Sequence, residues 1–280
     1  SVSAFLLNRS SDLQTSLQYD QKIGQVNFSA MGNFTFARNV IEDQDQPDYI
    51  EKYMNRTGQA RWQTFGYVSD GLFKDEADIA TSPDQSALGE VRPGDIKYKD
   101  LNNDGVIDSK DVKAIGYTDV PEIVYGFGVS AQWKGFDVSV FFQGNAHVSF
   151  SINSSMVRGF TEPKMAANNV FSDIYGNYWT ESNTDAKYPR LTTTEATNNN
   201  QSSDFWLVNG RYIRLKNAEF GYTFPKRLIQ KMRLSQLRVF VSGTNLLTFA
   251  PFKLWDPDLQ TGASNYPNTR VANIGLNIGF

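Results

Sequence analysis

The sequence of 280 residues contains no cysteine and a single histidine, His147. Without thiols the chain has no disulfide framework, and one histidine cannot form a histidine-based metal cluster or a catalytic triad within the chain. The 27 lysines and arginines are outnumbered by 30 aspartates and glutamates, so the chain lacks the basic footprint that nucleic-acid binding requires. No apolar run approaches the ~18 residues of a membrane helix, which excludes a helical membrane protein.

Aromatic residues are abundant, with 20 phenylalanines and 13 tyrosines. Seven segments alternate apolar and polar side chains, and the last of them ends at Phe280. The segments lie at residues 13–19, 26–36, 123–133, 136–147, 211–224, 237–244 and 272–280. A side-chain period of two with one apolar and one polar face is typical of a strand between lipid and water. Within the fifth segment, residues 211–216 alternate in the opposite phase, which predicts a bulge or a start outside the bilayer.

The connections between these segments alternate in length. Short connections lie at residues 20–24, 134–135 and 225–235, and long ones at residues 40–120, 150–204 and 250–269. Outer-membrane barrels alternate short periplasmic turns with long extracellular loops, and strands of ~9–11 tilted residues span a bilayer. The sequence therefore predicts an all-β fold: about seven antiparallel strands of a large transmembrane β-barrel with long extracellular loops. The predicted location is the outer membrane of a Gram-negative bacterium.

A soluble β-sandwich is the main alternative, because its strands alternate as well. Two loops of about eighty and about fifty residues on one side of a sheet are unusual for a compact domain. Seven strands cannot close a barrel, since bacterial single-chain barrels have even strand numbers and an open edge in lipid leaves backbone groups unpaired. We therefore interpret the chain, which does not begin with methionine, as a processed or fragmentary piece. Its first and last strands should pair with strands outside this sequence, and outer-membrane lipid should cover its apolar face.

One short motif indicates a specific chemistry. Residues 100–111 fit the twelve-residue calcium loop of EF-hands, with Gly105 at the sharp turn and Ile107 at the anchoring position. Ca²⁺ takes six to eight oxygen ligands. The predicted ligands are the side chains of Asp100, Asn102, Asp104, Asp108 and Asp111 and the carbonyl of Val106. Position twelve is Asp rather than Glu, as in dockerin-type loops. We expect a structural role, in which the ion pins an extracellular loop at residues 95–116; a solvated turn without an ion is the alternative.

Polar side chains on the lumen-facing phase of the strands are candidate substrate contacts. On phase alone they are Gln132, Asp137, Gln143, Asn145 and Glu219. The acidic ones lie on different strands without a nucleophile beside them, so an enzyme is the least favoured class. We expect His147 to be a polar wall residue, and the basic residues at 226–227 and 231–233 to form a solvated periplasmic face. The aromatics of the long loops either contact sugars or partner proteins or pack the loops together: Trp62, Tyr67, Tyr175, Tyr178, Trp179 and Trp206.

Several stretches, in order along nearly the whole chain, resemble the C-terminal half of the barrel of SusC-like (SusC/RagA) TonB-dependent transporters. They include PGDIKYKD at residues 93–100, KGFD at 134–137, YIRLKN at 212–217, TNLLT at 244–248 and WDPD at 255–258. The resemblance implies a barrel of about 22 strands with an N-terminal plug. It also implies import of large nutrients, usually oligosaccharides or peptides, with energy delivered by TonB and a SusD-like surface lipoprotein as a lid. Phe280 would serve as the recognition signal for the barrel-assembly machinery.

The plug, the TonB box and the first strands of that family are absent from this sequence. Residues 1–280 are therefore interpreted as a C-terminal portion of the barrel, which needs the remaining N-terminal part to transport. A passive porin or a structural outer-membrane scaffold with a calcium-stabilised loop is the alternative function. A dockerin-like binding module is disfavoured, because it would carry a second calcium loop and the sequence contains one.

Overall fold

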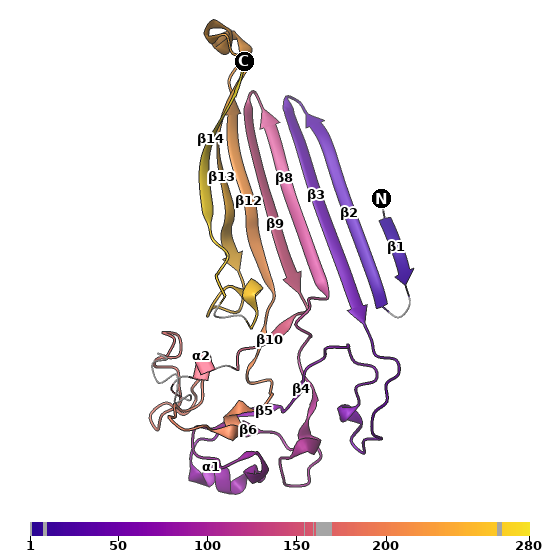
Figure 1. Cartoon of the computed structure of the whole chain (residues 1–280), viewed down its shortest axis with the longest axis vertical. Helices are drawn as coiled ribbons and strands as arrows, with labels where there is room; N and C mark the ends of the chain where they lie inside the picture. The colour runs from indigo at the N-terminus through magenta and orange to yellow at the C-terminus, as the bar shows by residue number, and fades with distance from the viewer. Residues whose placement is uncertain (1, 8–9, 154, 159, 161–169, 262–264) are drawn as a thin grey trace.

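A computed structural model describes residues 2–7, 10–153, 155–158, 160, 170–261 and 265–280. One antiparallel sheet of eight strands dominates it, in the order β1-β2-β3-β8-β9-β12-β13-β14 (Figure 1). The bounds are β1 Val2–Leu7, β2 Ser10–Ile23, β3 Val26–Asn39, β8 Ile123–Trp133, β9 Phe136–Ala146, β12 Tyr212–Thr223, β13 Gln236–Phe249 and β14 Val271–Gly279. The prediction of an antiparallel array of long strands is confirmed.

Strand β1 is an addition to the seven predicted strands. Its sequence runs through four consecutive apolar residues, from Ala4 to Leu7, so it carries no alternation from which a strand could be recognised.

No helix among the residues that the structure describes is long and apolar enough to cross a membrane.

The short connections lie at one end of the sheet, which we call the turn end, and two of them are tight turns. Lys134 and Gly135 both have positive φ, 47° and 90°, as a two-residue hairpin loop requires. The turn predicted at residues 20–24 is shorter than expected, because β2 continues to Ile23 and β3 begins at Val26. Between β12 and β13 lie the short helix α3 (Lys226–Ile229) and the 3₁₀ helix η6 (Gln230–Met232).

The predicted irregularity in residues 211–216 is a β-bulge. The register of β12 shifts between Leu215 and Asn217 against both of its neighbours, β9 and β13. One extra residue on the bulged strand moves the following side chains to the other face, because the side-chain period of a strand is two. The bulge therefore explains why the two halves of this segment alternate in opposite phases.

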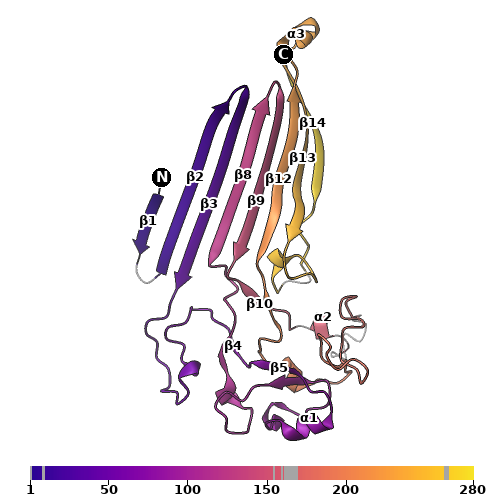
Figure 2. The ribbon, with the colours of Figure 1, turned by 180° about the vertical axis from the view of Figure 1, so that it is seen from behind.

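Three long connections meet at the other end of the sheet, which we call the loop end (Figures 1 and 2). The first long loop spans residues 40–122, the second 147–211 and the third 250–270. Their short elements are η1 Lys52–Met54, β4 Phe65–Gly66, β5 Ser69–Leu72, α1 Glu76–Thr81, η2 Ser86–Leu88, β6 Ile96–Tyr98, η3 Ser109–Asp111, β7 Lys113–Ala114, β10 Ser149–Ser151, α2 Ser155–Arg158, η5 Thr197–Asn200, β11 Leu207–Asn209 and η7 Pro257–Leu259. β4 pairs with β7, β5 with β6 and β10 with β11.

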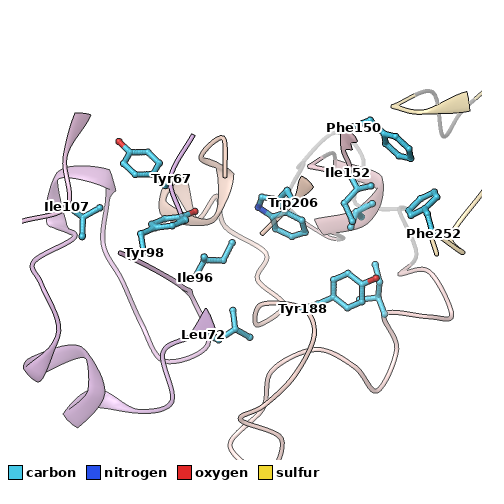
Figure 3. Packing of buried hydrophobic residues seen from close by; sticks show 12 residues of the cluster. Tyr67, Leu72, Ile96, Tyr98, Ile107, Phe150, Ile152, Tyr188, Trp206 and Phe252 are labelled. Carbon is cyan, nitrogen blue, oxygen red and sulfur yellow. The ribbon is translucent and has the colours of Figure 1, made fainter. Parts of the chain in front are cut away.

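The hydrophobic core lies in these loops rather than against the sheet. Its buried residues come from all three long loops, and Trp206 lies between the group around Tyr98 and the group around Phe252 (Figure 3). The rings of Phe150 and Phe252 meet edge to face with centroids 5.1 Å apart, which joins the second loop to the third. Packing among the loops thus makes them a folded layer at the loop end.

The apolar face of the sheet is covered by none of the residues that the structure describes. Ile274 is 84% exposed, Leu17 66% and Phe220 51%, and similar residues continue across the strands. Soluble proteins do not leave a contiguous apolar face of this extent in water. Such a face is buried in a core or contacts a partner protein or a membrane. The sheet therefore has the two-sided character predicted from its alternation.

Candidate functional site

The five predicted lumen residues lie on one face of the sheet, opposite the exposed apolar face. The register pairs Gln132 directly with Asp137, and Asp137 with Gly221. Directly paired residues share a face, and so do residues two apart on a strand. Gln143 and Asn145 therefore lie on the same face as Asp137, and Glu219 lies on the same face as Gly221.

Two of these residues are joined by an arginine that the sequence reading did not single out. Arg238 of β13 donates from Nη2 to Glu219 Oε1 at 2.6 Å and from Nε to Asp137 Oδ1 at 3.1 Å, and Nη2 also bonds Asp137 Oδ2. The three residues come from β13, β12 and β9, three adjacent strands. Asp137 and Glu219 thus form a charge-paired tie across the polar face.

A glycine makes this tie possible. Arg238 crosses β12 at Gly221, where a Cβ atom would collide with the guanidinium group. A similar arrangement explains Phe240, which interrupts the polar face: its ring lies over Gly275 of β14, its direct partner. The Arg238 guanidinium carbon lies 4.7 Å from the centre of the Phe240 ring. Small residues on one strand therefore accommodate large side chains that reach over from the next.

The other three predicted lumen residues are not drawn into the tie. Asn145 accepts a hydrogen bond at Oδ1 from the Tyr212 N–H at 3.2 Å. Gln132 is exposed and Gln143 half-buried, and no side-chain hydrogen bond involves either of them among the described residues. Their amide groups are therefore the polar groups of this set that are free to contact a solute.

The sequence predicted His147 within the strand wall, but the structure places it just beyond the end of β9. It adopts a left-handed conformation there (φ 52°). Its Nδ1 lies 3.0 Å from Glu122 Oε2, and its ring stacks on Tyr117 at 4.5 Å. Glu122 also accepts two hydrogen bonds of 2.7 Å from Arg38. The hydrogen bonds from Arg38, opposed by burial and aided by His147, hold the pKa of Glu122 below its ordinary value of 4.5. This cluster joins the end of β3 to the end of the first long loop and the start of the second.

The predicted calcium loop folds back on itself in the structure. Gly105 adopts φ 86°, a conformation that suits glycine, at the position where the motif requires a sharp turn. Asp100 accepts hydrogen bonds from the N–H groups of Asn103 at 2.6 Å and Gly105 at 2.7 Å. Asp111 accepts one from Leu101 N–H at 2.7 Å. The twelfth position of the motif therefore lies beside the first two.

The loop is anchored by its middle. Ile107 is fully buried in the loop core, and its N–H donates to the Asp84 carbonyl at 2.8 Å. Asp111 is also fully buried, and no lysine or arginine pairs with it within the described part of the chain. Its second oxygen accepts from Asp108 N–H at 2.9 Å. The loop thus keeps a buried carboxylate whose contacts are backbone N–H groups.

On the exposed side of the loop, the side chains contact one another and do not point toward a common metal position. Asn102 donates to Asp104 Oδ2 at 2.9 Å, which lowers the pKa of Asp104 together with a bond from Val106 N–H. Lys110 Nζ lies 3.4 Å from Asp104 and 3.5 Å from Asp108. Among the described residues, no three His, Cys, Asp or Glu side chains converge as a preformed metal site. The oxygen donors are present in the predicted order, and gathering them around an ion would require side-chain rotations.

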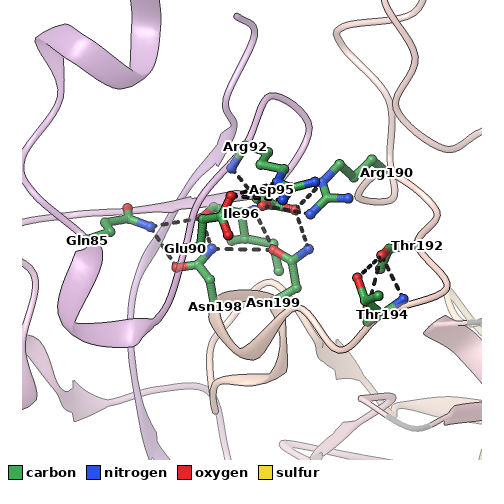
Figure 4. Close-up of polar contacts among 10 residues, drawn as sticks. All are labelled: Gln85, Glu90, Arg92, Asp95, Ile96, Arg190, Thr192, Thr194, Asn198 and Asn199. Atoms are coloured by element: carbon green, nitrogen blue, oxygen red, sulfur yellow. Dashed lines mark hydrogen bonds and ion pairs between the residues drawn. The ribbon is translucent and has the colours of Figure 1, made fainter. Parts of the chain in front are cut away.

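A buried polar network that the sequence reading missed links the first two long loops (Figure 4). Asp95 is fully buried and bonds Arg190 through Nε at 2.8 Å and Nη2 at 3.2 Å. Asn199 Nδ2 donates to Asp95 at 2.8 Å, and Asn199 Oδ1 accepts from Ile96 N–H at 2.8 Å. Gln85 donates to Asn198 at 2.9 Å. The only sequence signal was the PGDIKYKD stretch, which contains Asp95 and whose partners lie about a hundred residues away.

A second tie fixes the third long loop to the sheet. Arg214 of β12 is buried and bonds Asp258 through Nη1 at 3.0 Å, and it also bonds Asp256. Tyr212 Oη donates to Asp258 at 2.6 Å, and Arg214 Nε donates to Thr248 at 2.9 Å. The YIRLKN and WDPD stretches are thus in mutual contact. Sequence order alone gave no sign that these two motifs meet.

The loop aromatics differ in burial. Tyr67 and Trp206 are buried in the loop core, whereas Trp62 is 62% and Tyr175 78% exposed. A concavity of about 350 Å³ opens beside Trp206 at the meeting of the second and third loops. Tyr188, Phe205 and Phe252 line it, with Lys187 and Lys253 among the polar residues at the same opening. The loop layer therefore offers both exposed rings and an aromatic pocket of small-molecule size.

Comparison with known proteins agrees with this geometry. No family model matches the chain. TonB-dependent receptor P3 of Formosa agariphila is 30% identical over 88% of this chain, and receptor P26 of the same organism is 28% identical over 75%. The chain spans about a quarter of these curated relatives, 26% of P3 and 22% of P26.

Solved structures show the same fold. The RagAB peptide transporter superposes with a TM-score of 0.70 at 21% identity, covering 97% of this chain and 29% of that one. The "closed-closed" state of the RagAB peptide importer gives 0.68 at 22% identity, covering 97% and 29%. The relatives are receptors and transporters rather than enzymes. The chain is thus related in sequence to part of the TonB-dependent receptors, and it has the fold of a segment of the RagAB peptide transporter.

Proposed function

We propose that this chain forms part of the wall and the outer vestibule of an active importer in the outer membrane of a Gram-negative bacterium. The importer takes up large nutrients, oligosaccharides or peptides. The remaining N-terminal part closes the barrel and supplies a plug, and TonB drives transport through that plug. A SusD-like lipoprotein covers the loop end.

One observation carries this proposal: the sheet buries neither of its faces and closes neither of its edges. β1 and β14 each have a neighbour on one side only among the described strands, and the apolar face is exposed across the sheet. Backbone groups at open edges are satisfied in lipid only when further strands close the barrel. The RagAB structures, named as a peptide transporter and importer, support a peptide or other large nutrient as the cargo.

Exposed apolar side chains on the first two long loops support a lid at the loop end. Ile50 is 92% exposed, Trp62 62% and Tyr175 78%. Exposed aromatics of this kind are enriched where proteins meet partners. The folded loop core holds their backbones in place, because all the long loops contribute to it.

Uptake by the full-length transporter tests the active-import proposal. Cells that express it as their sole importer should accumulate a labelled peptide or oligosaccharide mixture only when TonB is present. Deleting the TonB-binding segment of the full-length protein should abolish uptake while leaving the amount of barrel in the membrane unchanged. Uptake that persists without TonB would instead identify a passive porin.

Co-purification tests the lid. A SusD-like lipoprotein should elute with the wild-type transporter, and replacing Trp62 and Tyr175 with alanine should weaken its retention. Leu228→Ala at the turn end is the matched control, because it removes an exposed apolar side chain from the opposite end of the sheet. Absence of any such lipoprotein from the wild-type preparation would refute the lid.

We also propose that residues 100–111 bind Ca²⁺ and thereby stiffen the first long loop. The donor set consists of carboxylate, amide and carbonyl oxygens, which is the set that Ca²⁺ prefers. Asp111 supports the proposal because it is fully buried and no lysine or arginine of the described part of the chain pairs with it, and buried carboxylates are normally paired or bound to metals. Asp100, Asn102, Asp104, Val106 and Asp108 would supply the remaining oxygens, and Lys110 would yield its place beside Asp104.

Calorimetry on the intact protein tests this site. We expect Ca²⁺ binding by the wild type that Asp100→Ala and Asp104→Ala abolish. Asp75→Ala is the control, since Asp75 caps α1 through the Asp78 N–H and lies outside the motif. Hydrogen exchange in residues 95–116 should slow when Ca²⁺ is added. A wild type that shows neither heat nor slower exchange would leave the loop as a solvated turn.

A further inference from the structure

The connection between β12 and β13, residues 225–235, is the most basic short segment at the turn end. It carries Lys226, Arg227, Lys231 and Arg233 and no acidic residue. All four are exposed, and none forms an ion pair within the described residues. These charges are therefore available to an anionic partner. We call residues 225–235 the basic connection.

The basic connection also exposes apolar side chains. Leu228 is 62% and Met232 64% exposed, four residues apart, a spacing that brings side chains to the same side of a helical turn. Ile229 between them is buried (2%), and its carbonyl accepts from the Leu234 N–H at 3.2 Å. The segment is thus anchored, with two apolar side chains beside four cations.

Aromatic residues next to the basic connection indicate where it lies relative to the membrane surface. Phe136 and Tyr222 have ring centroids 4.5 Å apart, and Tyr222 and Phe224 5.0 Å apart. Aromatic clusters at the end of an apolar strand face mark the level of lipid headgroups. The basic connection begins directly after Phe224 and projects past the hairpin turns of β8 and β9 (Figure 2).

We propose that the basic connection binds anionic phospholipid headgroups of the leaflet at the turn end. Cations beside exposed apolar side chains, directly beyond an aromatic cluster at headgroup level, are the features by which a peripheral segment recognises an anionic membrane surface. A merely solvated basic turn gives no reason for Leu228 and Met232 to remain exposed together. The inference rests on the proposed membrane location, and it adds a lipid class and the residues that select it.

Hydrogen exchange of the full-length transporter in lipid nanodiscs tests the proposal. The two lipid compositions are phosphatidylethanolamine alone and phosphatidylethanolamine with one quarter phosphatidylglycerol. We expect the basic connection to exchange roughly fivefold more slowly with phosphatidylglycerol, the factor for one effective basic contact with an anionic surface. Raising the salt concentration should reverse the difference, because exposed charges are screened.

Two variants make the result specific. The test variant neutralises the basic connection and should lose the lipid-dependent slowing: Lys226→Gln, Arg227→Gln, Lys231→Gln and Arg233→Gln. The control removes four exposed cations from the loop end and should keep it: Lys52→Gln, Lys74→Gln, Lys187→Gln and Arg211→Gln.

Equal exchange of the wild type in both lipids would overturn the inference, and so would an equal loss of slowing in the control variant. Slowing that appears only after a soluble acidic protein is added would also overturn it in favour of a protein partner. Alkaline carbonate extraction separates this failure from that of the proposed function. A transporter that stays in the membrane without a lipid response refutes only the lipid inference.

Discussion

Replacing Asp95 with alanine should loosen the junction between the first two long loops. The change removes a fully buried carboxylate that accepts hydrogen bonds from Arg190, Asn199 and the Arg92 N–H. The Arg190 guanidinium, 20% exposed, would lose its only ion pair among the described residues. Removing one partner of a buried pair typically costs about 3–5 kcal/mol, because the other charge stays buried and unpaired.

The assay is hydrogen exchange of the full-length transporter, read at strand β6 and at residues 197–200. A loss of about 3–5 kcal/mol in local stability corresponds to exchange faster by roughly two to nearly four powers of ten. The increase of about two powers of ten applies if the wild-type loops already open locally at a low free-energy cost. The exchange rate then soon reaches that of the unprotected backbone and cannot rise further.

Glu90→Ala is the matched control. Glu90 pairs with Arg92 at 2.9 Å, close to Asp95 in sequence, but both side chains are exposed, 74% and 60%. Exposed ion pairs contribute about 0–1 kcal/mol, so this variant should leave exchange almost unchanged. The double variant Asp95→Ala with Arg190→Met should recover part of the loss, because it also removes the stranded charge. If Asp95→Ala behaved like Glu90→Ala, the network would not hold the loops together.

Two further predictions follow from the sheet and from α1. Gly221→Ala should displace Arg238 and destabilise the purified barrel by about 1–3 kcal/mol, as at other overpacked sites, which lowers its unfolding temperature. Gly32→Ala is the control and should leave the unfolding temperature unchanged, because a Cβ there would meet nothing nearer than 3.9 Å. Equal shifts in the two variants would contradict the reasoning. Burial alone would raise the pKa of Asp78, but the bonds from Lys97 at 2.8 Å and from backbone N–H outweigh it, so the pKa lies below its ordinary 3.8. Because a depressed carboxyl pKa gives stability that is present above the unfolded value and lost as the pH falls through the folded one, protection of α1 should drop below about pH 4. Lys97→Gln should flatten this drop, and a pH profile identical to that of the wild type would argue against the pair.

Much of the sheet could be predicted from sequence because its physics is local. A strand between lipid and water must alternate with a period of two, and that pattern survives in the printed residues from Val26 to Phe36 or from Ala272 to Phe280. The turn at Lys134-Gly135 and the bulge near Lys216 also left local signals. Strand β1 left no such signal, because its apolar residues are consecutive and do not alternate with polar ones.

The sequence by itself therefore determined seven of the eight strands of the sheet, their two faces and the alternation of short and long connections. It also placed the oxygen donors of residues 100–111 in the order of a calcium loop, since that motif is contiguous. Only the tertiary structure decided which charges meet. Asp95 pairs with Arg190, and Arg238 passes over Gly221 to Asp137, although each pair is separated by about a hundred residues. Such contacts depend on strand register and loop packing, which no local pattern encodes, so the loop layer and its ties became visible only in three dimensions.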